Sequence, residues 1–221
     1  MHSVQINAFG KPWEVVETVT LPDPGAPGSG EIVIDMEFAP INPSDLVLMR
    51  GVYGIKPKLP APVGAEGVAR VSKIGAGVTS LKEGDRVLFP RGASTWLSRS
   101  KVKADGLFAL PAKADPQQLS MLTVNPPTAY LMLTEYVALK KGDWVIQSAG
   151  NSAVGRAVIA IAKKLGIHTV SVVRRPELID ELKKLGADVV LVEGPDLAKR
   201  VAEATGKAKI MLALDSVGGP G

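Results

Sequence analysis

The chain contains no cysteine and only two histidines, His2 and His168. Without cysteine it has no disulfide framework, no thiol nucleophile and no cysteine-ligated metal. Two histidines 166 positions apart in sequence do not form the spaced cluster that a histidine metal site needs. We therefore expect no metal site.

Long apolar runs are also missing, since no segment reaches the roughly 18 consecutive apolar residues that cross a bilayer. The first residues, Met1 to Glu14, lack the apolar core of a signal peptide and the Arg- and Ser-rich pattern of a transit peptide. We expect a cytoplasmic protein with no membrane partner.

The composition that remains is globular. Hydrophobic residues make up 46% of the 221 positions and charged residues 22%, which is enough apolar material for a core. The net charge is +4, and the basic residues are scattered along the chain instead of forming blocks. This distribution suits a small phosphate-bearing ligand, and we expect no nucleic-acid partner.

The sequence pattern changes near residue 115. Before it, prolines and glycines separate short runs rich in Val and Ile, which predict a β-rich or barrel-like lobe with strands at 31–39, 67–75 and 85–90. After it, apolar strands alternate with helices, which predicts a parallel sheet covered on both faces. The expected strands are 144–149, 168–173, 188–193 and 209–217, and the expected helices are 127–139, 153–165, 176–185 and 197–206.

We therefore expect two domains, a β-rich lobe at 1–115 and a dinucleotide-binding α/β domain at 116–221. A complete doubly wound dinucleotide-binding sheet has six strands, whereas only four are predicted here. The expectation is a sheet truncated after its fourth strand.

A glycine-bearing turn follows the strand at 144–149. Its residues, Gly150, Asn151, Ser152, Ala153, Val154 and Gly155, lead directly into the helix at 153–165. The dinucleotide fingerprint G-x-G-x-x-G has its first and third glycines here and Ser152 at its second. Unpaired N–H groups and the helix dipole at such a turn favour a phosphate, although an ordinary βα turn without ligand has the same pattern.

The end of the next strand distinguishes between the two nicotinamide dinucleotides. A site for NADH carries Asp or Glu about 20 residues after the turn, hydrogen-bonded to the ribose. Arg174 and Arg175 occupy this place instead. Two guanidinium groups suit a 2′-phosphate, so the sequence predicts NADPH. The alternative is a pair of solvated arginines at a strand end.

Several motifs lie in order along the chain and resemble those of the medium-chain dehydrogenase/reductase superfamily. They are Ile41-Asn42-Pro43-Ser44-Asp45, Gly64-Ala65-Glu66-Gly67, Leu81-Lys82-Glu83-Gly84-Asp85-Arg86-Val87 and Gly142-Asp143. The resemblance implies a GroES-like β-rich catalytic lobe followed by a Rossmann-type domain. Zinc-dependent members have His where this chain has Ala65, so the zinc-free branch is implied.

Within that branch the chain is similar to the mitochondrial-type 2-enoyl thioester reductases. The similarity rests on three motifs, Arg50-Gly51-Val52-Tyr53-Gly54, Val124-Asn125-Pro126-Pro127-Thr128-Ala129-Tyr130 and Asn151-Ser152-Ala153-Val154-Gly155. The family reduces the 2,3 double bond of enoyl thioesters of CoA or acyl-carrier protein with NADPH. The resemblance implies Tyr53 as the proton donor. It also implies cofactor contacts at Asn125, Thr128, Gly150 to Gly155, Arg174 and Arg175, and a homodimer for the full-length protein.

Other readings remain open for individual residues. Asn42 and Asn125 each precede a proline, where either can be a turn or N-cap residue. For Asn42 this is as reasonable as a role in the site, whereas for Asn125 the resemblance favours a cofactor contact. Asp45 suits a loop stabiliser better than a base, and His168 suits a structural role. A basic group at Lys56, Lys58, Arg91, Arg99, Lys101 and Lys103 fits either the phosphates of CoA or a carrier protein, or a solvated surface.

Three functional classes fit the sequence. The first is an NADPH-dependent enoyl thioester reductase, and the second is a zinc-free NADPH oxidoreductase acting on quinones or enals. The third is a nucleotide-binding or partner-binding module without catalysis.

Overall fold

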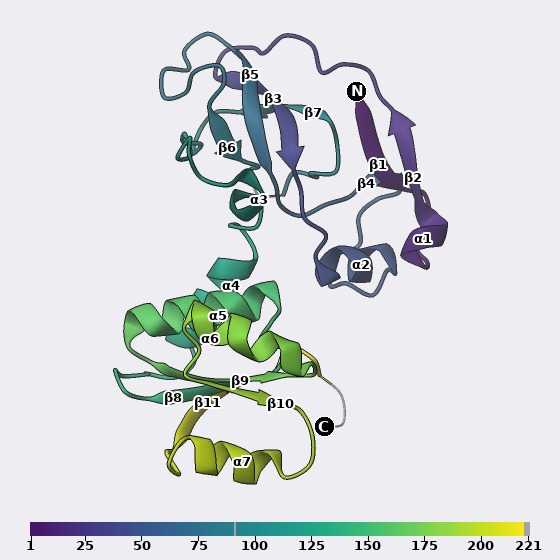
Figure 1. Cartoon of the computed structure of the whole chain (residues 1–221). Helices are drawn as coiled ribbons and strands as arrows, with labels where there is room; N and C mark the ends of the chain where they lie inside the picture. Colours follow the sequence, from purple (N-terminus) through teal and green to yellow (C-terminus); the bar gives the residue numbers. More distant parts are fainter. Residues whose placement is uncertain (91, 219–221) are drawn as a thin grey trace. The chain divides into compact units, whose positions relative to one another are not determined.

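The computed structural model describes residues 1–90 and 92–218 (Figure 1). The chain divides into two compact units, Met1–Val124 and Asn125–Gly221. We expected the division at residue 115, whereas the structure has it at Val124. Leu119 is the reason, since it is buried in the first unit against Val68 and Leu110.

The larger sheet of the first unit is antiparallel, with strand order β6-β5-β3-β7. Its strands are β3 (Glu31–Phe38), β5 (Val68–Ile74), β6 (Arg86–Leu88) and β7 (Arg99–Lys103). The inward-facing residues of β3, β5 and β6 form an apolar cluster with Leu81, Phe89 and Ala104. The three strands predicted in this lobe are confirmed, each within a few residues.

A smaller sheet, with order β2-β1-β4, completes the first unit. It contains β1 (His2–Ile6), β2 (Val16–Thr20) and β4 (Ala61–Pro62), accompanied by the short helices α1 (Pro12–Val15) and α2 (Pro43–Met49). Ile6, Met49, Ala61 and Val63 form its buried cluster. The short helix α3 (Pro116–Leu119) packs against β3 and β5 of the larger sheet. These elements were not predicted, because strands and helices this short carry too few apolar repeats to produce a period.

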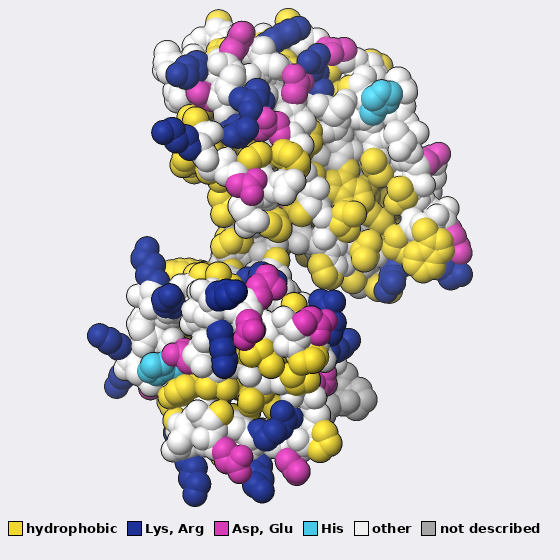
Figure 2. All heavy atoms as spheres, viewed as in Figure 1, with side chains coloured by type: hydrophobic (Ala, Val, Ile, Leu, Met, Phe, Trp, Pro, Cys, Tyr) yellow, Lys and Arg dark blue, Asp and Glu magenta, His cyan; other side chains and the backbone are white. Residues whose placement is uncertain are grey.

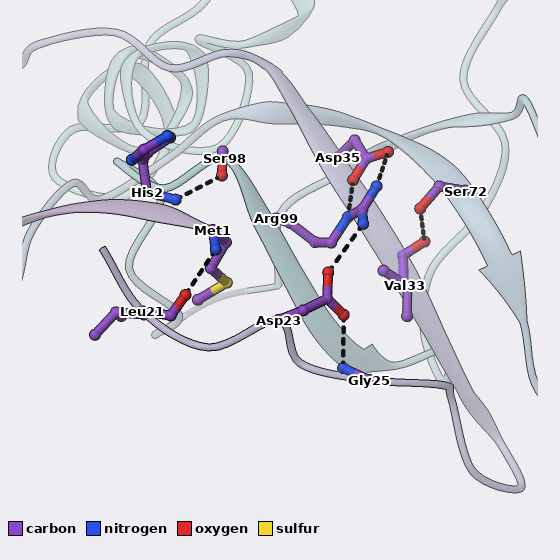
Figure 3. Close-up of polar contacts among 10 residues, drawn as sticks. All are labelled: Met1, His2, Leu21, Asp23, Gly25, Val33, Asp35, Ser72, Ser98 and Arg99. Atoms are coloured by element: carbon purple, nitrogen blue, oxygen red, sulfur yellow. Dashed lines mark hydrogen bonds and ion pairs between the residues drawn. The ribbon is translucent and has the colours of Figure 1, made fainter. Parts of the chain in front are cut away.

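Arg99, at the start of β7, does not belong to a free basic surface. Figure 3 shows its guanidinium between two carboxylates, with Nε 2.5 Å from Asp35 Oδ1 on β3 and Nη1 3.0 Å from Asp23 Oδ2 in the preceding loop. Arg99 lowers the pKa of the Asp35 carboxyl, and Asp35 and Asp23 raise the pKa of Arg99. Arg99 is therefore paired with carboxylates of its own unit, and Arg91 lies outside the described residues.

The second unit is the predicted α/β domain. Its sheet is entirely parallel, with order β10-β9-β8-β11. The strands are β8 (Trp144–Gln147), β9 (His168–Val173), β10 (Val189–Val192) and β11 (Ile210–Leu214). The helices are α4 (Asn125–Thr134), α5 (Ala153–Leu165), α6 (Ile179–Leu185), which continues from the 3₁₀ turn η1 (Pro176–Leu178), and α7 (Leu197–Ala204).

Helices cover both faces of this sheet, as expected for a parallel sheet. Figure 1 shows α4, α5 and α6 on one face and α7 on the other. Helix α5 contributes to two buried clusters, Val158 and Ala162 to that of β8 and β11, and Ile159 to that of β9 and β10. It ends at Gly166, whose φ of 73° is the left-handed conformation that a C-terminal glycine supplies. The position of α5 across the sheet therefore fixes the turn that precedes it.

The surface carries its charge in dispersed form. Figure 2 shows Lys and Arg side chains spread over the visible face of each unit and mixed with Asp and Glu. Among residues 1–90 and 92–218, no helix is long and apolar enough to cross a membrane.

An ion-pair cluster on the larger sheet of the first unit provides a test of this fold. Glu37 accepts hydrogen bonds from Arg86 Nε at 2.6 Å and from Arg70 Nε at 3.0 Å. Burial raises the pKa of the Glu37 carboxyl, but the bonds from Arg86 and Arg70 outweigh it and hold the pKa below the usual 4.5. Because the folded pKa is lowered, the carboxylate stabilises the fold above about pH 4.5, and this stabilisation is lost as the pH falls.

We predict that Glu37→Gln lowers the free energy of unfolding by about 1–2 kcal/mol at pH 7, a typical value for a partly exposed charged hydrogen-bond cluster. The difference from the wild type should shrink as the pH falls below about 4. Chemical denaturation at several pH values measures this. Glu83→Gln, at an exposed turn position of the same unit, is the control. A deficit that stays constant between pH 7 and pH 3 would contradict the ion-pair account.

Candidate cofactor-binding and catalytic site

The predicted glycine-bearing turn joins β8 to α5 at the carboxyl edge of the parallel sheet. Ser152 is the N-cap of α5, and its Oγ accepts a hydrogen bond from the Gly155 N–H at 3.0 Å. Ala153 and Val154 follow as the first helical residues, where N–H groups have no acceptor within the helix. The thirteen-residue helix adds its dipole, so this end is suited to an anion such as a pyrophosphate.

The two glycines of the turn are required by close packing. A Cβ at Gly155 would lie 2.7 Å from the carbonyl oxygens of Ala149 and Gly150, and one at Gly150 would lie 2.7 Å from Ser171 Cβ on β9. These contacts match the roles of the fingerprint's first and third glycines, which allow a tight turn and close helix–strand packing. Ala149 adopts a φ of 47°, a left-handed conformation that is costly for a residue with a Cβ.

Two side chains that the sequence reasoning missed hold this turn. Gln147, which is buried, donates from Nε2 to the Gly155 carbonyl and to Ser171 Oγ, both at 3.0 Å. Arg156 donates from Nε to the Asn151 carbonyl at 3.0 Å, and its Nη1 pairs with Glu181 at 2.7 Å. No sequence motif marks either residue, because their importance comes from the position of α5 over the sheet.

Arg174 and Arg175 directly follow β9, the neighbour of β8 in the sheet. The Gly150 N–H donates to Val172 O, which ties the turn to the end of this strand. Both guanidinium groups are exposed, and their ion pairs with Glu193 (3.5 Å) and Glu177 (3.7 Å) are long. Such exposed pairs stabilise little, so a phosphate can replace them at small cost. The turn and the two arginines thus lie at the same edge of the sheet.

Tyr53 lies in the first unit, in the loop after α2. Its side chain is 43% exposed. The base of the loop is held by Gly51, whose N–H donates to Leu48 O and whose φ is 72°. A Cβ there would lie 2.9 Å from the Phe9 side chain, so glycine is needed before the tyrosine. The start of the loop is therefore held in place by Gly51, while the Tyr53 side chain remains partly exposed to solvent.

Asn42 and Asp45 form the capping box of α2. Asn42 is the N-cap, and its N–H donates to Asp45 Oδ2 at 2.7 Å. Burial raises the pKa of the Asp45 carboxyl above its usual value. The hydrogen bond from the Asn42 N–H lowers this pKa, and the nearby Glu66 charge raises it. The expected stabilising role of Asp45 is confirmed. Asn42 also donates from Nδ2 to Glu66 Oε1 at 2.9 Å.

Asn125 and Thr128 lie at the start of α4. Asn125 is its first residue and is buried, whereas Thr128 is exposed. In the neighbouring segment, Thr123 and Val124 donate their N–H groups to Glu66. Sequence reasoning assigned no role to Glu66, although its motif, Gly64-Ala65-Glu66-Gly67, was recognised.

His168 has the structural position expected of it, and Lys56 and Lys58 lie at the surface. His168 Nδ1 lies 2.8 Å from Asp188 Oδ1, and its ring stacks on Trp144 at the amino end of the sheet, away from the turn. Lys56 and Lys58 are exposed in the loop after Tyr53. Within the described part of the chain, no three His, Cys, Asp or Glu side chains are close enough to hold a metal ion.

Two family models match most of the chain. The alcohol dehydrogenase GroES-like domain matches residues 28–118, and the zinc-binding dehydrogenase model matches residues 153–221. The mitochondrial enoyl-[acyl-carrier-protein] reductase of Caenorhabditis elegans is 42% identical over 209 residues. That match covers 92% of this chain and 59% of the relative, so the chain spans little more than half the relative's length.

Solved structures show the same similarity. The mitochondrial 2-enoyl thioester reductase Etr1p/Etr2p heterodimer from Candida tropicalis is 33% identical with a TM-score of 0.81, covering 99% of this chain and 69% of that one. A mutant of Etr1p in complex with NADP and crotonyl-CoA is 31% identical, with a TM-score of 0.85 and the same coverage. The Escherichia coli quinone oxidoreductase complexed with NADPH is 29% identical with a TM-score of 0.84, covering 99% and 67%.

Both units thus match one kind of protein in their sequence, their fold and the order of their motifs. The chain belongs to the medium-chain dehydrogenase/reductase superfamily, and within it to the enoyl thioester reductase type.

Proposed function

We propose that the chain is the NADPH-binding and proton-donating part of an enoyl thioester reductase. The observation that carries the proposal is the glycine-bearing turn at the N-terminus of α5, with Arg174 and Arg175 at the adjacent strand end. The similarity to enoyl reductases, among them one solved with NADP and crotonyl-CoA, supports the substrate class.

The residues at the sheet edge fit NADPH. The N-terminus of α5 would hold the pyrophosphate, and Gly150 and Gly155 let the turn and the helix pack closely enough on the sheet to form this site. Arg174 and Arg175 would bind the 2′-phosphate, and Asn125 and Thr128 would contribute further polar contacts. When bound, NADPH supplies the hydride that goes to the β-carbon of the thioester.

The first unit would supply the other half of the reaction. Hydride addition at the β-carbon leaves negative charge on the thioester oxygen and requires a proton at the α-carbon. The Tyr53 hydroxyl, which can donate a hydrogen bond, would stabilise that oxygen or deliver this proton. The product is the saturated acyl thioester of CoA or acyl-carrier protein.

A quinone or enal substrate is the second candidate, favoured by the similarity to the quinone oxidoreductase complexed with NADPH. Assays with crotonyl-CoA and with a quinone panel, both with NADPH, separate the two candidates. Activity only with quinones would overturn the proposed substrate, and binding of NADPH without any reduction would favour a module without catalysis.

Location and assembly remain predictions. The relative from C. elegans is named as a mitochondrial protein, and a cytoplasmic location for this chain is our expectation from its first residues alone. The proposed homodimer of the full-length protein is consistent with the heterodimer named for the Candida enzyme.

The arginine pair predicts cofactor preference. The double variant Arg174→Ala/Arg175→Ala should weaken NADPH binding by about 10- to 100-fold, because charged hydrogen bonds to the 2′-phosphate are lost from a solvent-screened site. NADH binding should hardly change. Fluorescence titrations of both cofactors measure this, with Lys199→Ala on α7 as the matched loss of an exposed cation. Equal NADPH and NADH affinities in the wild type would refute the assignment.

Tyr53 predicts a defect confined to chemistry. Tyr53→Phe removes the hydroxyl and keeps the ring, so kcat for crotonyl-CoA in the intact enzyme should fall by about 10²- to 10⁴-fold. NADPH affinity should stay the same, because the proposed phosphate contacts lie in the second unit. Steady-state kinetics and a cofactor titration test this together. Retention of most of the kcat would place the donor elsewhere, and loss of both properties would make Tyr53 a structural residue.

A further inference from the structure

The carboxylate of Glu66 is buried and surrounded by donors. Only 1% of the residue is exposed. Its Oε2 accepts from the Thr123 N–H at 3.0 Å, from Thr123 Oγ1 at 3.1 Å and from the Val124 N–H at 2.9 Å, while Oε1 accepts from Asn42 Nδ2 at 2.9 Å. A buried charge is tolerated only when hydrogen bonds replace its water. Four such bonds from two segments hold those segments together.

Thr123 and Val124, which donate three of these bonds, are the last two residues of the first unit. Val124 is its last residue, and α4 begins at the next position, Asn125. Val124 therefore occupies the N-cap position of α4. In an ordinary capping box, the N–H of the N-cap residue donates a hydrogen bond to the side chain of a Glu three residues later in the same helix. Thr128, Pro127 and Pro126 occupy this part of α4, none of which carries a carboxylate. Glu66, 58 residues earlier in the sequence, accepts this N–H instead.

We propose that Glu66 is a positioning residue, whose carboxylate fixes Thr123 and Val124 and so sets where α4 and its first residue, Asn125, begin. The proposal goes beyond the proposed function and rests on it only for the consequence that Asn125 contacts the cofactor. In zinc-dependent members of the superfamily this Glu follows a zinc-binding His. Here the neighbouring residue is Ala65, and the carboxylate holds the last two residues of the first unit.

The variants Glu66→Gln and Asn42→Asp, made singly and together, test the hydrogen bond between these two side chains. In Glu66→Gln, the new amide oxygen can still accept from Thr123 and Val124. The amide N–H₂ then faces Asn42 Nδ2, so that two donor groups meet where the wild type has a donor and an acceptor. In Asn42→Asp, two carboxylates face each other. The double variant restores one donor and one acceptor and keeps the number of carboxylates. It should be less impaired than either single variant, which is a favourable coupling between the two sites.

Amide hydrogen exchange at Thr123 and Val124 in the 221-residue chain reports the anchoring directly. Glu66→Gln should accelerate exchange there by about 10-fold, with the β5 amides of Val68–Ile74 unchanged as an internal reference. The double variant should return most of this protection. Exchange unchanged in Glu66→Gln, or a double variant no better than either single one, would overturn the proposal. Acceleration shared equally by β5 would show general destabilisation and would overturn it as well.

An NADPH titration of the same variants separates this inference from the proposed function. Glu66→Gln should weaken NADPH binding severalfold, and the double variant should recover it. If the wild type binds no NADPH, the proposed function fails, whereas the exchange experiment still decides whether Glu66 anchors the segment. If exchange changes as expected and NADPH affinity does not, the consequence for Asn125 is wrong and the positioning role is limited to the chain itself.

Discussion

The close approach of helix α5 to the sheet is the constraint on which the second unit depends. Gly155 lies so near the carbonyls of Ala149 and Gly150 that any side chain at this position would displace the helix. This approach places the N-terminus of α5 over the carboxyl edge of β8 and beside the end of β9. Gln147 and Arg156 then hold the turn at the Gly155 and Asn151 carbonyls. A pyrophosphate cradle needs this combination of exposed N–H groups and a rigid support.

The first unit holds Tyr53, the proposed donor, on an exposed loop. The Tyr53 loop has little apolar contact of its own, since Val52 and Ile55 are both more than 70% exposed. Its base is fixed instead by the end of α2 and by the glycine that packs on Phe9. Helix α2 is in turn capped by Asn42 and Asp45, and Asn42 is bonded to Glu66. One polar network thus reaches from the N-terminus of α2, the helix that precedes the Tyr53 loop, to the last residues of the unit.

Much of the second unit could be predicted from the sequence. Buried parallel strands such as His168–Val173 are nearly continuous apolar runs, and amphipathic helices such as α5 repeat their apolar residues every three to four positions. The first unit was harder. Strand β7, Arg-Ser-Lys-Val-Lys, has no apolar run, and its pairing with β3, to which the Arg99–Asp35 bond contributes, depends on residues far away in the sequence. Arg174 and Arg175 could be found from their spacing after the turn. Glu66, Gln147 and Arg156 could not, because their partners are distant or are backbone carbonyls, which leave no pattern in the sequence.

The proposed function depends on the turn from Gly150 to Gly155 binding the pyrophosphate of NADP through its backbone. A titration of the ¹⁵N-labelled chain with NADP, followed by amide NMR spectra, is the decisive experiment. We expect saturable shifts centred on the N–H groups of Ser152, Ala153 and Val154, together with smaller shifts at Arg174 and Arg175. Shifts confined to other parts of the chain, or none at millimolar NADP, would show that this turn does not bind the cofactor.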